Sequence, residues 1–205
     1  MLPIERDVKK YIMVVSAKVL AISSSTNATP IEVTTGTHGF VTGDKVTING
    51  HATNTAANGT WTITRVSATK FTLDGSVGNG IGGATGVVAS FIEPLHVKDY
   101  RHLLVSFASD GGGTADATIK CCGSIQETVP DFAAPRSVAN NFEFVMMVDK
   151  QSSGSGLPGD TGVVFGGADD YLQFEVNVNG LNFLGFLPTA GTVGTYTIKA
   201  MILNP

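Results

Sequence analysis

Short runs of alternating apolar and polar residues, each ended by Gly or Asn-Gly, dominate the first half of this sequence. The stretch HGFVTGDKVTING covers residues 38–50, and NGTWTITRV repeats the pattern at residues 58–66. Alternation places every second side chain on the same face, as in a β-strand with one buried face. Gly and Asn tolerate the positive φ angles that tight turns require. The glycines are therefore expected to be joints between strands rather than parts of a binding loop.

Residues 28–80 are predicted to form a small β-barrel of short strands. The strand runs, each with apolar residues two positions apart, lie at residues 31–35, 45–50, 60–66 and 70–75. The expected core of this unit contains Phe40, Trp61 and Phe71. Val66 is expected to reach the same core, through a bulge or at the end of its strand.

Residues 93–205 are predicted to form an antiparallel β-sandwich, jelly-roll-like in type. The strand runs lie at residues 102–108, 117–123, 142–148, 172–178, 181–187 and 195–203. One hairpin is expected around the loop SDGGGTAD, between the first two runs. A second hairpin is expected at Asn179-Gly180, because Asn-Gly is typical of two-residue hairpin loops. The fold class is therefore all-β, with a small N-terminal barrel followed by a C-terminal sandwich.

Two further segments complete the predicted organisation. Residues 1–27 are expected to be an N-terminal arm or strand, because the run YIMVVSAKVLAI at residues 11–22 is rich in β-branched residues. This run is shorter than the ~20 apolar residues that cross a bilayer, and Glu5 and Asp7 do not fit the start of a signal peptide. Residues 81–92 are expected to be a Gly-rich linker and a strand.

The composition favours a subunit of an assembly. Charged residues make up 15% of the chain, below the roughly 25% of typical soluble proteins. The net charge of −4 argues against a nucleic-acid partner, since phosphate binding needs clustered Lys and Arg. The pair Lys9-Lys10 is expected to be solvated, and no membrane partner is expected.

Two sequence features that can carry chemistry have simpler interpretations here. Cys121 and Cys122 are adjacent, so in a strand they point to opposite faces, and we expect free thiols with one of them buried. Gly78, Gly80 and Gly83 match G-x-G-x-x-G formally. A dinucleotide site needs a helix directly after this motif. The strand run VVASF follows instead, so no nucleotide cofactor is expected.

No metal or catalytic site is predicted. The four histidines, none of which has the spacing of a zinc site, are His38, His51, His96 and His102. His38 is expected to make a local hydrogen bond in a turn. The acidic residues Asp110–Asp116, Asp160 and Asp169–Asp170 are expected to form Asx-turns, with calcium binding as the alternative. A carboxylate pair for glycosidase chemistry stays open, because its two members need no proximity in sequence.

The run ATPIEVTTGTHGFVTGDKVTING…AANGTWTITRVSATKFTLDGSVGNG, residues 28–80, resembles a module found widely in tailed-phage structural proteins. This module is often likened to the first catalytic cysteine half-domain (FCCH) of ubiquitin-activating enzymes. The matching positions are Pro30, His38–Phe40, Gly43-Asp44, Asn58-Gly59, Trp61, Phe71 and Asp74-Gly75. The segment contains no Cys, so the resemblance implies an FCCH-like barrel used as a building block and not ubiquitin chemistry. Residues 123–132, Asn140-Asn141 and residues 175–186 are similar to β-sandwich domains of phage virion proteins.

The resemblance implies a non-enzymatic structural protein of a tailed-phage virion, assembled in the host bacterial cytoplasm. A capsid decoration, or cement, protein is favoured, with the major capsid protein or other virion subunits as partners. A homotrimer is expected, whose N-terminal arm contacts neighbouring subunits, so that deleting Met1–Ile22 should leave a folded trimer. The alternatives are a tail or fibre adhesion module that binds a host-surface glycan through loops 110–116 and 151–162, and a virion glycosidase.

Overall fold

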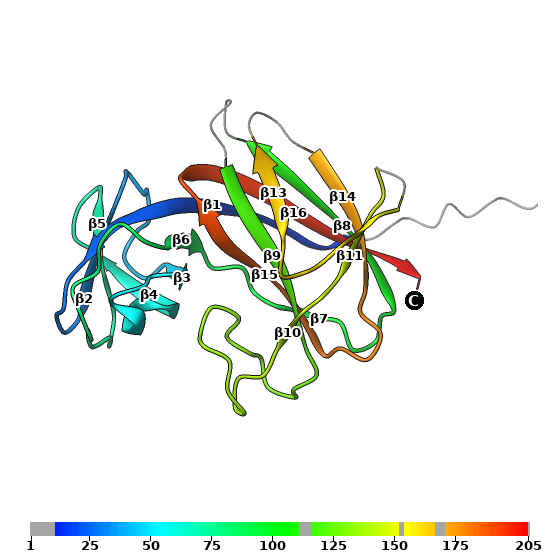
Figure 1. Ribbon diagram of the computed structural model, residues 1–205, viewed down its shortest axis with the longest axis horizontal. Helices are drawn as coiled ribbons and strands as arrows, with labels where there is room; N and C mark the ends of the chain where they lie inside the picture. The colour runs from blue at the N-terminus through cyan, green and yellow to red at the C-terminus, as the bar shows by residue number, and fades with distance from the viewer. Residues whose placement is uncertain (1–10, 111–115, 152–153, 167–170, 205) are drawn as a thin grey trace, which may run out of the picture.

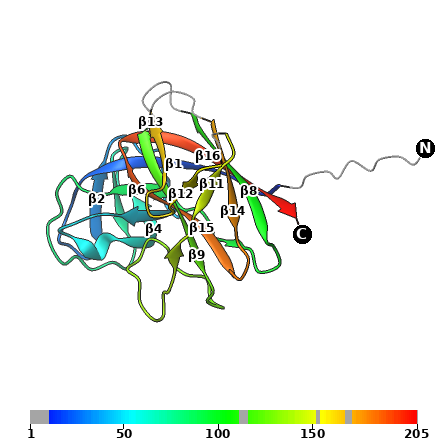
Figure 2. The same cartoon turned by 45° about the vertical axis from the view of Figure 1, so that its right-hand side comes forward.

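The structure, a computed structural model, describes residues 11–110, 116–151, 154–166 and 171–204. These residues form a closed six-stranded antiparallel barrel at one end of a two-sheet sandwich (Figures 1 and 2). The predicted fold class, an all-β chain with a barrel and a sandwich, is therefore confirmed.

The barrel closes through six strands in the order β1-β2-β5-β4-β3-β6, with β6 pairing back onto β1. The strands are β1 (Tyr11–Ser25), β2 (Ile31–Thr35), β3 (Lys45–Asn49), β4 (Gly59–Arg65), β5 (Lys70–Leu73) and β6 (Val87–Ser90), and the 3₁₀ helix η1 (Thr55–Ala57) links β3 to β4. The barrel core contains Phe40 and Phe71, with Trp61 packed against it, as expected. One barrel strand comes from before residue 28 and another from after residue 80.

The sandwich consists of two facing sheets. The first sheet has the order β12-β11-β14-β8-β16-β1 and adds β8 (His102–Asp110), β11 (Met147–Asp149), β12 (Gly156–Leu157), β14 (Tyr171–Asn177) and β16 (Val193–Asn204) to β1. The second sheet is built from β7 (Leu95–His96), β9 (Asp116–Ser124), β10 (Glu143–Phe144), β13 (Val163–Gly166) and β15 (Phe183–Gly191). The predicted alternation in β14 is confirmed, because Phe174, Val176 and Val178 are buried and Leu172 packs against the core.

The barrel and the sandwich share a wall made of β1 and β6. Val19 of β1 packs in the sandwich core, and the next residue, Leu20, packs in the barrel core. The same division holds in β6, where Val87 faces the sandwich and Val88 faces the barrel. Successive side chains of a strand point to opposite faces, so both faces of this wall are buried. Such strands appear in sequence as continuous apolar runs rather than alternating ones.

This wall contradicts the interpretation of residues 11–22 as a separable arm. β1 pairs with β16 along residues 11–20 and with β2 and β6 nearer its end. Ala17, Val19, Leu20 and Ile22 are buried. Deleting Met1–Ile22 would therefore open both cores, and a folded product is not expected. Residues 1–10 lie outside the described residues.

Both predicted hairpins of the sandwich are wrong, because each turn joins strands of different sheets. β8 pairs with β14 and β16, whereas β9 pairs with β10, β13 and β15. The Asn179-Gly180 turn exists, and Gly180 has a φ of +84°. It leads from β14 to β15, which lies in the opposite sheet. The turn chemistry was identified correctly, but β14 already has β8 and β11 on its two edges.

Two smaller expectations are also wrong. The run at residues 142–148 is split into β10 and β11, which belong to different sheets, because the chain crosses between the sheets at Val145 and Met146. Val66 is exposed, because β4 ends at Arg65 and the chain turns there through hydrogen bonds to Lys70 O.

The shared wall predicts that the two units unfold together. Leu20→Ala should lower the free energy of unfolding by about 2–5 kcal/mol, the cost of emptying a buried leucine site. The fluorescence of Trp61, the single Trp of the chain, reports on the barrel, and far-UV circular dichroism reports on all strands. Both denaturant transitions should coincide and should shift together in Leu20→Ala. Val138→Ala, at a 97% exposed side chain, is the control and should shift neither. Two separate transitions would contradict a shared core.

Candidate functional site: the barrel–sandwich junction

A long loop, residues 125–142, covers the outer face of the second sheet and reaches the barrel. Phe132 and Phe142 pack there against Cys122, Phe183 and Leu187. Asn140 holds the loop in shape, accepting a hydrogen bond from the Asp131 amide at 2.8 Å and donating one to Asp131 O at 2.8 Å. Loops of this length usually carry function or fold into compact units of their own.

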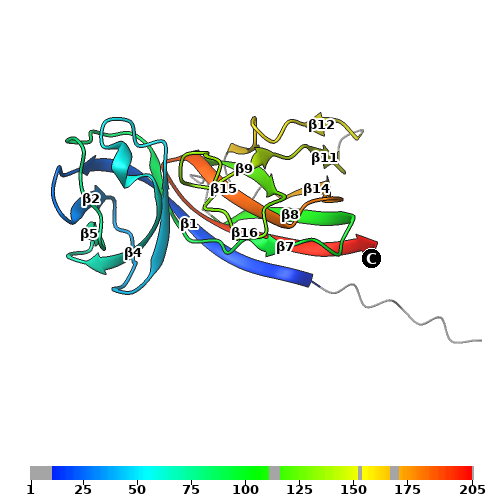
Figure 3. The same ribbon diagram turned by 90° about the horizontal axis from the view of Figure 1, so that it is seen from below.

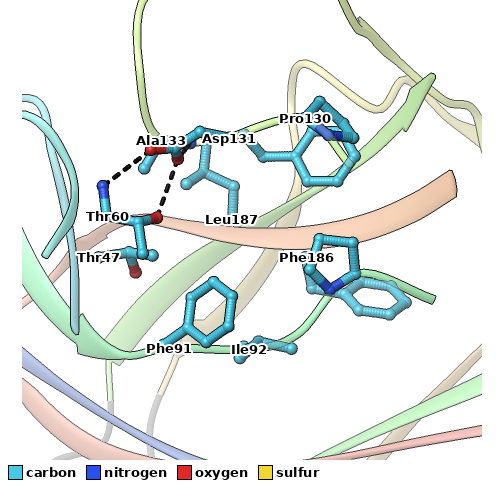
Figure 4. A pocket seen from close by; sticks show the side chains of 11 residues that line it. Thr47, Thr60, Phe91, Ile92, Pro130, Asp131, Ala133, Phe186 and Leu187 are labelled. Carbon is cyan, nitrogen blue, oxygen red and sulfur yellow. Dashed lines mark hydrogen bonds between the residues drawn. The ribbon is translucent and has the colours of Figure 1, made fainter. Parts of the chain in front are cut away.

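The loop is fastened to the barrel by one carboxylate. Thr60, in β4, donates to Asp131 twice, from its amide to Oδ2 and from its hydroxyl to Oδ1, both at 2.9 Å (Figure 4). The amides of Ala133 and Ala134 donate to Asp131 Oδ1 as well, at 3.0 and 3.3 Å. Hydrogen bonds to a charged acceptor are about twice as strong as neutral ones. Asp131 is therefore a clamp between the two units, and its acceptor positions are occupied.

The space beside this clamp is too small for a substrate. Its walls come from the barrel (Thr47, Thr60), the β6–β7 connection (Phe91, Ile92, Pro94), the loop (Pro130, Asp131, Phe132, Ala133) and β15 (Phe186, Leu187). The enclosed volume is about 20 Å³, which holds one water molecule. The junction at this point is a packed seam.

A shallow groove of about 260 Å³ continues from the seam toward solvent. The Arg136 guanidinium lies 5.9 Å from the Phe142 ring centre and 5.5 Å from that of Phe144, and Lys120 Nζ lies 5.0 Å from the Phe144 ring centre. Arg136 also pairs with Glu143 at 2.8 Å. These cation–ring contacts cover the aromatic faces, which are therefore not free to stack on a ligand.

A larger groove, about 620 Å³, lies at the edge of the sandwich beside β10, β11 and β14. On its polar wall, Glu175 lies 2.9 Å from His102 Nδ1, and it also pairs with Lys150 Nζ at 2.6 Å. The hydrogen bond from Lys150 lowers the pKa of Glu175, and the charges of Lys150 and His102 act in the same direction. The opposite wall is apolar, with Phe144, Val145, Met146, Val148 and Leu181. No hydroxyl or thiol side chain of the described residues lines this groove.

A Ser–His pair is present, but it is enclosed. His51 Nε2 accepts from Ser25 Oγ at 2.7 Å, and His51 Nδ1 donates to Thr85 O at 2.7 Å. Asn54 Nδ2 donates to Ser25 Oγ at 3.0 Å. Ser25 is 3% exposed and His51 is 1% exposed, and a Cβ added to Gly82 would lie 2.0 Å from His51 Nε2. The cluster therefore ties the end of β1 to the Gly-rich loop 76–86, and no substrate can reach it in this conformation.

The cysteines lie where the strand pattern placed them. Cys121 faces the sandwich core, and Cys122 faces the loop 125–142. Both are free and fully buried, whereas only one was expected to be buried. Burial raises the pKa of the Cys122 thiol to about 12 and that of Cys121 well above its usual value. Neither thiol is an activated nucleophile.

The remaining residues singled out in the sequence lie apart from one another. His38 accepts a hydrogen bond from the Phe40 amide at 2.9 Å, so the predicted local bond is confirmed. Asp116 accepts from the Thr192 amide and hydroxyl at 2.7 and 2.6 Å, and these bonds lower its pKa. The Gly78–Gly83 run leads into β6 rather than a helix. Residues 111–115, 152–153 and 167–170 of the acidic and candidate glycan loops lie outside the described residues.

In the described residues no three His, Cys, Asp or Glu side chains gather as metal ligands. The same part of the chain contains no helix with the length and hydropathy of a membrane span. Comparisons with protein-family models, with curated proteins and with solved structures found no match to this chain.

The Asp131 clamp predicts a measurable cost for its loss. Asp131→Ala leaves the amide and hydroxyl of Thr60 without their acceptor, and we expect the free energy of unfolding to fall by about 1–3 kcal/mol. Denaturant unfolding followed by Trp61 fluorescence measures this change. Asp99→Ala, at an exposed residue, is the matched control and should change stability by less than about 0.5 kcal/mol. Equal stability of both variants would show that the clamp contributes nothing.

The buried His38 predicts acid sensitivity. Its burial lowers its pKa, and the charges of Arg65 and Lys18 add to this effect, while the backbone carbonyls of Lys70 and Ser67 oppose it. In the unfolded chain the imidazole titrates near pH 6.5. Below that pH the unfolded state binds the proton more readily, so the free energy of unfolding should fall as pH falls from about 7 to 5.

His38→Gln should flatten this decline relative to the unchanged protein, as measured by urea unfolding at a series of pH values. Val138→Gln, at an exposed residue that does not titrate, is the control and should leave the pH dependence as it was. An unaltered slope in His38→Gln would assign the acid sensitivity to other groups.

Proposed function

We propose that this protein is a non-enzymatic structural subunit of a tailed-phage virion, and that it serves as a decoration protein on the capsid. The observation that carries the proposal is the construction of the chain as one body. The barrel and the sandwich share β1 and β6 and are clamped by Asp131 and Thr60. A body whose two units share strands suits a subunit that bridges neighbours in a shell. The resemblance of residues 28–80 to a building block of tailed-phage proteins is the reason for proposing a phage virion as the assembly.

The surface of loop 125–142 supports an assembly role. Ile125, Val129 and Val138 of this loop are exposed, and Val138 is 97% exposed. Asn182 donates to Ile125 O at 2.8 Å, and Gln126 donates to Val138 O at 3.2 Å. The apolar side chains are thus displayed on a backbone that hydrogen bonds hold in place, which lowers the entropy lost on binding. We propose that this loop contacts the major capsid protein or another virion subunit.

Particle binding tests the role. Added to particles that lack it, the purified protein should bind in hundreds of copies per particle, counted by quantitative mass spectrometry. Val138→Asp should weaken this binding about tenfold, because a charge would be desolvated at the interface. Val164→Asp, at a 61% exposed valine of β13, is the matched control and should bind normally. A dozen copies or fewer would favour a tail or fibre adhesion module, and absence from particles would refute the proposal.

A further inference from the structure

The first eight residues of β1 form an open edge of the sandwich. β16 pairs with one side of β1, whereas β6 covers the other side only at Val19–Ala21. Figure 3 shows this part of β1 at the outer margin of its sheet, beside β16. The last of these residues, Lys18, still donates its amide to Ser90 Oγ, so the free part, Tyr11–Ala17, spans about 24 Å at ~3.4 Å per residue.

The direction of the backbone groups in this segment follows from the bonds at its end. The amides of Lys18 and Ile22 donate to Ser90 Oγ and Gly86 O, away from β16, whereas the amide of Ala21 donates to Thr192 O, toward β16. From Met13 on, where the register with β16 is continuous, even-numbered residues therefore point their backbone groups outward; a register shift lies between Tyr11 and Met13. No hydrogen bond to the outward groups of Val14 and Ser16 is present among the described residues.

This edge lacks the features that normally prevent strands from pairing with other chains, which are Pro, charged side chains and covering segments. It contains no Pro, and Tyr11 and Val14 are exposed, Val14 by 62%. Its one charged residue, Lys18, donates to Thr37 O and His38 O on the barrel and so does not guard the edge. Met13 and Val15 pack against the sandwich core but are only partly buried. The core under this edge is therefore incomplete.

We propose that two copies of this chain pair through this edge, antiparallel, about a two-fold axis at Val14. We choose a second copy of the chain as the partner because, across a two-fold axis, the β1 edge of one copy can pair with the same edge of the other. The other outer strands, β7, β10, β12 and β13, have two to four residues, and the unpaired part of β15 packs against β1 and β6 and carries Pro188. Among the described strands, β1 is the one with an edge long enough for a stable ladder.

The register of this pairing follows from which residues of β1 point their backbone groups away from β16. With the axis at Val14, the two Val14 residues form a hydrogen-bonded pair, with their Cα atoms about 5.5 Å apart. Met13 of each copy then lies opposite Val15 of the other, on the face that turns toward the sandwich cores. Pairing thus satisfies the outward backbone groups and covers Met13, Val14 and Val15 together. This inference does not depend on the virion role, and its test uses the isolated protein.

Sedimentation velocity at about 10–100 μM tests the pairing. The unchanged protein should have twice the 21.3 kDa mass of one chain. Val14→Pro removes an amide that faces away from β16, so the fold should persist while the ladder across the axis is blocked. Val14→Lys places like charges opposite each other. Both variants should run as single chains, whereas Val164→Lys, at a valine exposed to the same extent, should remain paired.

Cross-linking tests the register. A Cα separation of about 5.5 Å lies within the range that a disulfide spans. Val14→Cys oxidised with diamide should give linked dimers, whereas Val164→Cys should not, and the buried Cys121 and Cys122 should contribute no background. If Val14→Pro fails to fold by circular dichroism, Val14→Lys and Val14→Cys decide the result. A single-chain or threefold mass of the unchanged protein, or a dimer that survives both Val14→Lys and Val14→Pro, would overturn the proposal.

Discussion

The structure depends on a wall of two strands that is buried on both faces. Val19 and Leu20 of β1, like Val87 and Val88 of β6, send neighbouring side chains into different cores. A strand with two buried faces cannot be removed without exposing both cores, so neither unit is complete without the wall. The organisation of the chain is thus one body with two cores.

Where apolar packing ends, hydrogen bonds between polar side chains and the backbone hold neighbouring segments together. Asp131 joins the loop 125–142 to β4, and the Ser25–His51–Asn54 cluster joins β1 to the Gly-rich loop. Each is buried or half-buried with its partners in place, which fits the rule that buried polar groups are paired. Carboxylate, hydroxyl and imidazole groups carry chemistry in many enzymes, yet the surroundings of these residues leave no room for a substrate. The open surfaces at β1 and at Val138 are the places where we propose that other chains bind.

Local patterns were sufficient for individual strands and turns. Alternation located β2, β3, β4 and β5, and it placed Cys121 and Cys122 on opposite faces. The junction could not be found in this way, because Asp131 and Thr60 are 71 residues apart and no motif links them. The single signal available was the continuous apolar character of VLAI and VVA in β1 and β6, which indicates strands with two buried faces.

The sequence by itself therefore determined the all-β class, the positions of most strands and the places where the chain turns, because these follow from side-chain periodicity and from the φ preferences of Gly and Asn. The tertiary structure decided which strands pair. At Asn179-Gly180 the local turn is compatible with a hairpin, but both edges of β14 are already taken by β8 and β11. Which strands pair at each edge, and which core each side chain enters, depends on residues far apart in the chain, so no local sequence pattern predicts it.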